Sequence, residues 1–300
     1  MRVVVAIGGN ALLERGEVLS AETQRRNMAR AAGALAQLAD GNEMVLVHGN
    51  GPQVGLLALE GEAFKEAPPF PLDVLGAESQ GMIGYVIAQE MRNVMPERQV
   101  ATLITQTEVD PADLAFGAPS KPIGPVYSQA EAQALAKERG WQVAADGAYF
   151  RRVVPSPQPM DILEFQTIRL LAQEGALVIC AGGGGVPVIV GAKGQTRGVE
   201  AVIDKDLAAS LLATKLEADR LIILTDVDAV YEGWGTANAR KIVETNPAQL
   251  RGMPFAKGSM GPKVDAVCRF VEETGRPAAI GSLKEAALVA AGTAGTQILP

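Results

Sequence analysis

The sequence predicts an α/β fold in which helices cover a sheet of mostly parallel strands. Short apolar runs recur without polar alternation, which is typical of strands buried on both faces of a parallel sheet. Helical patterns separate these runs, as expected for strands joined by right-handed crossover connections. The 300 residues are 48% hydrophobic but only 4% aromatic, so the core must consist mainly of small and aliphatic side chains. This length is sufficient for one large domain or two smaller ones.

Six apolar segments are predicted to form the strands, the last more weakly than the others. They are Arg2–Ile7, Met44–His48, Val100–Ile104, Leu177–Ala181, Arg220–Thr225 and Ala278–Ile280.

Helices are predicted between these strands. Ser20 is a suitable N-cap for a helix whose apolar face carries Met28 and Leu35. A longer pattern covers Leu72–Met95 and ends before a proline, and another covers Asp161–Gln173. Two further helices are expected to begin after the polar caps Asp204 and Ser259.

The region 110–159 interrupts this alternation of strands and helices. It is rich in proline and contains a single helical pattern, Gln129–Arg139. A surface loop is the simpler interpretation, but about 50 residues without structure are rare in a compact domain. We therefore expect a small subdomain inserted into the sheet fold.

Composition argues against several functional classes. The net charge is −7 and no basic cluster is present, so nucleic acid is not expected as a partner. The cysteines Cys180 and Cys268 are far apart, which favours neither a disulfide framework nor a zinc site. No signal-peptide pattern and no apolar run of about 18 residues occurs, so we expect a cytoplasmic protein without a membrane partner.

Glycine-rich turns follow three of the predicted strands. They are Gly8-Gly9-Asn10, Gly49-Asn50-Gly51 and Gly182–Gly185. Parallel sheets bind ligands at the carboxyl ends of their strands, where consecutive backbone N–H groups can hold an anion. Such turns are common in α/β folds, so one alone is weak evidence, whereas several together favour a binding site. Neither a P-loop nor a dinucleotide-binding glycine motif is present.

His48, the only histidine, precedes the second of these turns. It could act as a general base. It could equally be a polar residue at the strand end that holds the turn. We favour the second role, because phosphoryl transfer to an anionic acceptor requires mainly positioning and charge neutralisation.

Two lysines lie at predicted helix starts, where the helix dipole disfavours a cation but favours a bound phosphate. Lys205 follows the cap Asp204, and Lys263 follows the cap Ser259. Exposed lysines tolerate such positions, but together with the glycine turns they indicate a phosphate site. Asp206 could hold the two ammonium groups in place, or it could be an ordinary acidic residue in a first helical turn.

Several other polar residues are weaker candidates. Lys121, between prolines of the inserted region, could close over a substrate or could be a solvated loop lysine. Asp226 and Asp228 end a predicted strand and could bind nucleotide or metal, or could shape the turn. Tyr231 and Trp234 could flank an adenine ring or serve only in packing. Arg151 and Arg152 could act like Lys121 or pair with surface acids.

Six separated motifs, which together extend over essentially the whole chain, resemble those of the carbamate kinases of the amino-acid-kinase family. The motifs occur in the family's order at Ala6–Leu12, His48–Gly55, Lys121–Pro125, Arg151–Pro157, Gly198–Asp206 and Gly258–Val264. Sibling kinases of acetylglutamate, aspartate or uridylate often have a lysine where this chain has Ala6. The sequence also departs from the family pattern at Ala229, Lys257 and Gly281.

The resemblance implies a three-layer αβα sandwich around an open, mostly parallel sheet, with a protruding subdomain. It implies an N-lobe of residues 1–109 and 160–200 that binds the acid substrate. Residues 110–159 would form the lid subdomain, and residues 201–300 a C-lobe that binds ATP. It further implies a homodimer.

The resemblance also implies roles for individual residues. Lys121, Lys205 and Lys263 would act on the transferred phosphoryl group, and Asp206 would organise them. The substrate-binding turns would comprise Gly8, Gly9, Asn10, Gly49, Asn50 and Gly51. The nucleotide would be bound by Asp226, Tyr231, Met260, Gly261 and Lys263.

The implied reaction is reversible phosphoryl transfer between ATP and carbamate, giving carbamoyl phosphate and ADP. The family mostly uses it to make ATP during arginine breakdown. Mg²⁺ would be carried by ATP or ADP, with no metal site formed by the protein itself. One alternative is a kinase of the same family with a different small acid acceptor. Another is a noncatalytic nucleotide-binding sensor.

Overall fold

The computed structural model describes residues 1–14, 16–256 and 258–300, apart from the side chain of Asn10. Lys257, one of the departures from the family pattern, therefore lies outside the described residues. The described residues form a central sheet in the order β15-β17-β16-β12-β1-β2-β9-β3, in which only β17 runs antiparallel to a neighbour, β16. Its strands are β1 Arg2–Ile7, β2 Glu43–His48, β3 Val100–Thr102, β9 Leu177–Cys180, β12 Arg220–Thr225, β15 Glu244–Thr245, β16 Ala278–Ser282 and β17 Thr296–Ile298.

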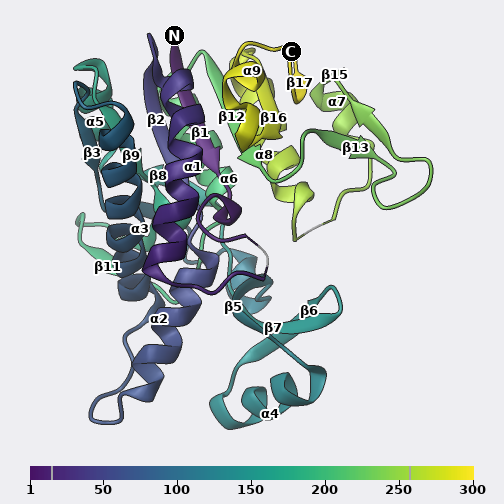
Figure 1. Ribbon diagram of the computed structural model, residues 1–300. Coiled ribbons are helices and arrows are strands. Elements are labelled where there is room, and N and C mark those ends of the chain that lie inside the picture. The colour runs from purple at the N-terminus through teal and green to yellow at the C-terminus, as the bar shows by residue number, and fades with distance from the viewer. Residues whose placement is uncertain (15, 257) are drawn as a thin grey trace.

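Helices cover both faces of this sheet (Figure 1). Alternate strand residues point to opposite faces, so Val3 and Val5 pack on one side of the sheet while Val4 and Ala6 pack on the other. The first face is covered by α1 Ala21–Ala39, α3 Leu72–Val94 and α9 Ala286–Ala290. The second is covered by α5 Phe165–Gln173, α6 Lys205–Lys215 and α8 Met260–Thr274. The predicted three-layer α/β fold is confirmed.

The helix starts agree with the predicted caps in two of three cases. The Ser20 side chain accepts a hydrogen bond from the Thr23 N–H, and Asp204 accepts from the first turn of α6. Ser259 occupies the N-cap of α8, but its side chain makes no capping bond, so that part of the prediction is wrong. Its carbonyl oxygen instead accepts from Lys263 Nζ at 3.3 Å.

The helix predicted over Asp161–Gln173 starts later, at Phe165, because the preceding residues belong to a strand. This strand, β8, pairs antiparallel with β4 in a second sheet, whose strand order is β11-β10-β4-β8. The strands of this sheet are β4 Gln106–Val109, β8 Pro159–Ile162, β10 Val186–Val190 and β11 Thr196–Gly198. The remaining small elements are η2 Leu114–Gly117, β13 Val230–Glu232, β14 Arg240–Ile242, α7 Pro247–Arg251 and η4 Leu283–Glu285.

The proline-rich insertion contains a sheet of its own. Strands β5 Lys121–Tyr127, β7 Tyr149–Val154 and β6 Gln142–Asp146 pair in that order, and α4 Gln129–Arg139 packs against them. The helix has the predicted bounds and starts with a capping box between Ser128 and Glu131. Figure 1 shows this protruding unit (β5, α4, β6 and β7) apart from the central sheet. The division of the chain into lobes and lid stays a prediction.

The protruding unit rests on helix α2 Gly51–Ala63, which the sequence reading did not predict. The contact is made by glycines: a Cβ added to Gly55 would lie 1.9 Å from the Cα of Gly124 in β5. Real Cβ atoms do not approach backbone this closely, so glycine is required at position 55.

Gly55→Ala should therefore destabilise the protein, because β5 must move away from α2. We expect the free energy of unfolding to fall by about 1–3 kcal/mol, as for other overpacked sites. Gly76→Ala is the matched control: this helical glycine has open space at the Cβ position, and alanine there should stabilise by about 0.5–1 kcal/mol. Urea unfolding of both variants measures the effect. A Gly55→Ala protein as stable as the wild type would contradict the contact.

No helix among the described residues is long and apolar enough to cross a membrane.

Candidate active site

The turns after β1, β2, β9 and β12 lie side by side, because these parallel strands are neighbours in the sheet. The N–H of Gly8 donates to the Leu224 carbonyl at 3.1 Å, and that of Gly49 donates to the Ile7 carbonyl at 3.2 Å. The first amide of each turn is thus used by the sheet. The amides of Gly9 and Gly51 stand further into the turns, at the starts of η1 (Gly9–Ala11) and α2, where helical N–H groups have no partner within the helix.

The third glycine turn, η3 Gly182–Gly184, has an unusual backbone. Ala181, Gly183, Gly184 and Gly185 all have positive φ, a conformation that favours glycine. Thr105 fixes this backbone, because its hydroxyl accepts from the Ala181 N–H at 3.0 Å and its carbonyl accepts from the Val186 N–H at 2.8 Å.

Gln80 of α3 forms a second support beneath the η3 turn. Its amide binds both the N–H and the carbonyl of Thr105, at 2.9 and 3.1 Å. Neither Gln80 nor Thr105 was predicted from the sequence, because Gln80 lies inside a predicted helix and Thr105 directly after a predicted strand, outside the glycine turns.

The glycine turns also pack directly against one another. A Cβ on Gly182 would lie 2.4 Å from the His48 ring, and a Cβ on Gly183 would lie 2.1 Å from the Asn50 amide nitrogen. That amide donates to the Ser79 hydroxyl at 2.8 Å, which holds Asn50 in place. The turns after β2 and β9 therefore form one interlocked wall.

His48 is 1% exposed, and its Nδ1 lies 3.1 Å from the Gly49 carbonyl oxygen. Burial disfavours the charged imidazolium and lowers its pKa to about 4; the Gly49 carbonyl opposes this shift and the Lys205 charge adds to it. The ring is thus neutral near pH 7. These contacts support the role of a strand-end residue that holds the turn.

The buried His48 should make stability fall below pH 6.5. Because its pKa is lower in the folded state, the unfolded chain binds the proton first, and the folding penalty develops between pH 6.5 and 4. At pH 5 it should be about 2 kcal/mol. Since the chain has one histidine, His48→Gln removes this titration completely. Urea unfolding at pH 7 and pH 5 should show a smaller loss for the variant; equal losses would contradict a neutral, buried ring.

Two lysines converge on one buried carboxylate. Asp206, 2% exposed, forms ion pairs with Lys205 and with Lys263, the latter at 3.3 Å. Burial alone would raise the pKa of Asp206, but the two ammonium groups outweigh it and lower the pKa to about 2. The carboxylate is therefore ionised and fixes both cations.

The two lysines differ in their surroundings. Burial lowers the pKa of Lys205, and the positive charge of Lys263 lowers it further. The negative charge of Asp206 acts in the opposite direction but does not cancel the shift. Burial also acts on Lys263, but the attraction of Asp206 and Asp204 exceeds it, so the pKa of Lys263 is raised. Lys263 is thus held more firmly as a cation than Lys205 is.

Lys205 connects this charge cluster to the glycine turns. Its aliphatic chain lies along Gly49, where an added Cβ would be 3.4 Å from Lys205 Cδ and 3.3 Å from the Gly9 nitrogen. The cation at the start of α6 therefore borders the turns that follow β1 and β2. This arrangement places positive charge beside the backbone amides predicted to hold the substrate.

Lys121 reaches the same region from the protruding unit. Its Nζ lies 2.5 Å from Asp204 Oδ2, while Asp204 Oδ1 accepts from the Asp206 N–H at 2.9 Å. Asp204 thus caps α6 and also anchors Lys121. The sequence alone predicts Asp204 only as a cap, because the partner lysine is distant in the chain and belongs to another sheet.

The predicted nucleotide residues are more dispersed. Asp226 follows β12 and interacts electrostatically with Lys263. The Tyr231 hydroxyl donates to Asp228 at 2.9 Å, and Lys241 pairs with the same carboxylate. Asp228 therefore shapes its turn.

The other predicted nucleotide residues lie at the start of α8 and in the turn after β13. Met260 and Gly261 form the first turn of α8, beside Lys263. Trp234 meets the edge of the Tyr231 ring and is 67% exposed.

One predicted residue cannot be placed in the same way. The side chain of Asn10 lies outside the described part of the chain, although its backbone belongs to η1. Among the described residues, no group of three or more His, Cys, Asp or Glu side chains is arranged to hold a metal ion.

Comparison with known proteins shows the family of this chain. Residues 1–282 match the model of the amino acid kinase family. The chain is 55% identical to the carbamate kinase of Escherichia coli K12 (99% of this chain, 98% of the relative) and 52% identical to that of Haemophilus influenzae (99% and 96%). The structure of carbamate kinase from Giardia lamblia bound to AMP-PNP superposes with a TM-score of 0.89 at 41% identity, covering 99% of this chain and 98% of that one. The chain therefore belongs to the amino acid kinase family and, within it, to the carbamate kinases.

Proposed function

We propose that this protein catalyses reversible phosphoryl transfer between ATP and carbamate, giving carbamoyl phosphate and ADP. The observation that carries the proposal is the convergence of Lys205 and Lys263 on the buried Asp206, beside the glycine turns. The relatives named carbamate kinase, and the Giardia enzyme bound to AMP-PNP, support both the acceptor and the nucleotide.

The residues would act mainly through charge. A phosphoryl group in flight spreads negative charge over its oxygens, and preorganised cations stabilise this charge without reorganising. Lys205 would contact the group on the side of the substrate turns and Lys263 on the side of the nucleotide. Lys121 would leave Asp204 and close over the transferred group, which excludes water.

The amides of the turns containing Gly8, Gly9 and Asn10, and Gly49, Asn50 and Gly51, would bind the carbamate oxygens. The nucleotide would lie against Asp226, Tyr231 and the Met260-Gly261 turn that leads to Lys263. Because Gly8 and Gly49 donate to strand carbonyls, their role would be to position the following amides.

ATP-dependent kinases in general require a divalent cation, here proposed to be Mg²⁺. The carboxylates Asp204 and Asp206 are occupied by lysines, and the described residues contain no metal-binding cluster. This donor set fits a cation coordinated chiefly by the nucleotide phosphates. Bound there, Mg²⁺ would screen the phosphate charge.

We also propose the oligomeric state, the cellular location, the division into lobes and the working direction. The motif resemblance supports a homodimer with an N-lobe of residues 1–109 and 160–200, a lid of 110–159 and a C-lobe of 201–300, and the sequence composition supports a location in the cytoplasm. It also supports ATP formation during arginine breakdown as the working direction. Light scattering coupled to gel filtration tests the dimer.

An acceptor screen tests the substrate. Purified protein with Mg-ATP should form ADP with carbamate and show no comparable rate with N-acetylglutamate, aspartate or uridylate. A preference for one of these other acceptors would overturn the assignment, and no turnover with any acceptor would favour a noncatalytic sensor.

A further inference from the structure

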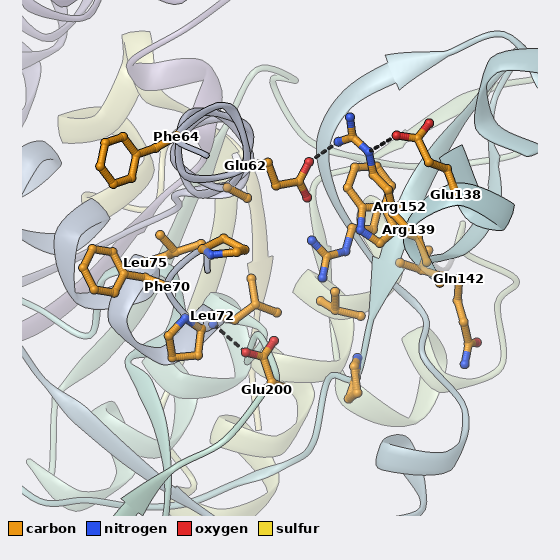
Figure 2. Close-up of a pocket in the computed structure, with 18 of the residues that line it drawn as sticks. Glu62, Phe64, Phe70, Leu72, Leu75, Glu138, Arg139, Gln142, Arg152 and Glu200 are labelled. Carbon is orange, nitrogen blue, oxygen red and sulfur yellow. Dashed lines mark hydrogen bonds and ion pairs between the residues drawn. The ribbon is translucent and has the colours of Figure 1, made fainter. Parts of the chain in front are cut away.

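A cavity of about 790 Å³ lies outside the site described above, between α2–α3 and the protruding unit. One wall is formed by the end of α2, the connection to α3 and the start of α3; the other is formed by β6, β7 and the end of α4. Figure 2 shows Glu62, Phe64, Phe70 and Leu75 on the first side and Arg139 and Arg152 on the second. The volume falls in the range of small-molecule sites.

Most charged groups of this cavity already have partners. Glu62 pairs with Arg139, and the Lys65 ammonium group donates to the Glu62 carbonyl at 2.8 Å. Glu200 accepts from the Leu72 N–H at 3.0 Å, at the start of α3. Glu138 is a further, largely exposed neighbour of Arg139 at 3.9 Å.

Arg152 is the exception. Its side chain makes no hydrogen bond or ion pair with the described residues, and its guanidinium lies 4.9 Å from the centre of the Trp141 ring. In Figure 2 it extends from β7 toward the centre of the cavity, whereas Arg139 is engaged by Glu62 and Glu138. Burial lowers the pKa of Arg152, with only partial compensation from Glu200 and Glu62. A planar, fork-shaped donor of this kind is suited to a carboxylate.

The rest of the lining is largely apolar. Leu72 and Leu75 are buried residues of the lining, and the exposed Phe70 stands at the rim. We propose that this cavity is a second ligand site, which binds a small organic carboxylate through Arg152 and packs its apolar body against Phe70 and Leu75.

An occupant would bridge α3 and the protruding unit. Arg152 pairs with Ile123 in the β5–β7 ladder, and two residues further on Val154 pairs with Lys121. A ligand held by Arg152 and Leu75 would therefore restrain β7, the strand whose Val154 pairs with Lys121 of β5. Binding should slow backbone hydrogen exchange in β5 and β7.

Trp141 lies in the cavity and reports on binding. In a Trp234→Phe background it is the sole tryptophan. Titration with 3-cyclohexylpropionate should change its emission in a saturable manner. The neutral 3-cyclohexylpropanol should bind at least about tenfold more weakly, because it lacks the charge-assisted bonds to Arg152. No saturable response, or equal binding of acid and alcohol, would overturn the proposal.

Variants locate the site. Arg152→Met should weaken binding of 3-cyclohexylpropionate at least about tenfold, measured by ligand-observed saturation-transfer NMR so that altered tryptophan emission does not interfere. Arg169→Met, which removes an arginine stacked on Phe165 away from the cavity, should bind like the wild type. Phe70→Ser should also weaken binding. Because Phe70 is exposed, this variant should fold, and it replaces Arg152→Met as the test if Arg152→Met does not fold. Retained affinity in the folded cavity variants contradicts the site, and binding without slowed exchange in β5 and β7 contradicts the restraint.

Discussion

Lys205→Met should reduce turnover about 100- to 1,000-fold, because it removes a preorganised cation from beside the substrate turns. Methionine matches the lysine side chain out to Cε, the part that packs along Gly49, so the backbone of the turn should be kept. The loss should appear mainly in kcat, since the charge that Lys205 neutralises develops in the transition state.

Lys215→Met is the matched control for this prediction. Lys215 lies on the same helix and pairs with Asp161, but both side chains are partly exposed, so its charge should matter little for turnover. Steady-state rates of ATP formation compare the two variants. Near-normal turnover in Lys205→Met, from protein with an unchanged circular dichroism spectrum, would remove Lys205 from the mechanism.

Asp206→Asn should lower the free energy of unfolding at pH 7 by about 3–5 kcal/mol. The change leaves Lys205 and Lys263 close together without the buried negative charge that compensates them. Asp161→Asn is the control, because it removes the exposed partner of Lys215 and should cost at most about 1 kcal/mol. Urea unfolding of both variants measures the difference.

The pH dependence identifies the cause of this effect. The folded-state pKa of Asp206 is about 2, below its ordinary value of 3.8, so its contribution to stability is present above pH 3.8 and is lost as the pH falls toward 2. The gap between wild type and Asp206→Asn should therefore be constant from pH 5 to pH 8 and narrow below pH 4. A gap that is as large at pH 2.5 as at pH 7 would contradict an ionised carboxylate as its source.

The layers of the fold could be predicted because they follow from local pattern. The inner strands β1, β2, β9 and β12 are buried, so each appears as an apolar run such as Val3–Ile7, whereas the edge strand β15 and its neighbour β17 have no such run and were not predicted. The helices α1 and α6 start at side chains that cap them, and α4 starts with a capping box. These signals lie within a few residues of the element that they specify.

The missed elements lack such signals. Helix α2 starts with Gly51 and Pro52, has no side-chain cap, and was obscured by the glycine turn before it. Ser259 has the residue type of a cap but a backbone conformation in which its side chain does not reach the first turn. Residue type alone does not determine this geometry.

The candidate site was predictable as a set of residues but not as an arrangement. Lysines at helix starts and glycines after strands pointed to Lys205, Lys263 and the turns. The second role of Asp204 and the support from Gln80 and Thr105 depend on contacts between distant segments. Such contacts become visible only once the chain is folded.

The most direct test of the proposed function is the reverse reaction. Purified protein mixed with carbamoyl phosphate and Mg-ADP should form ATP rapidly, as measured by a luciferase or hexokinase-coupled assay. ATP formation that is lost in Lys205→Met would establish both the reaction and the role of the lysine. Absence of ATP from well-folded protein that still binds ADP would contradict the account and direct attention to another acceptor.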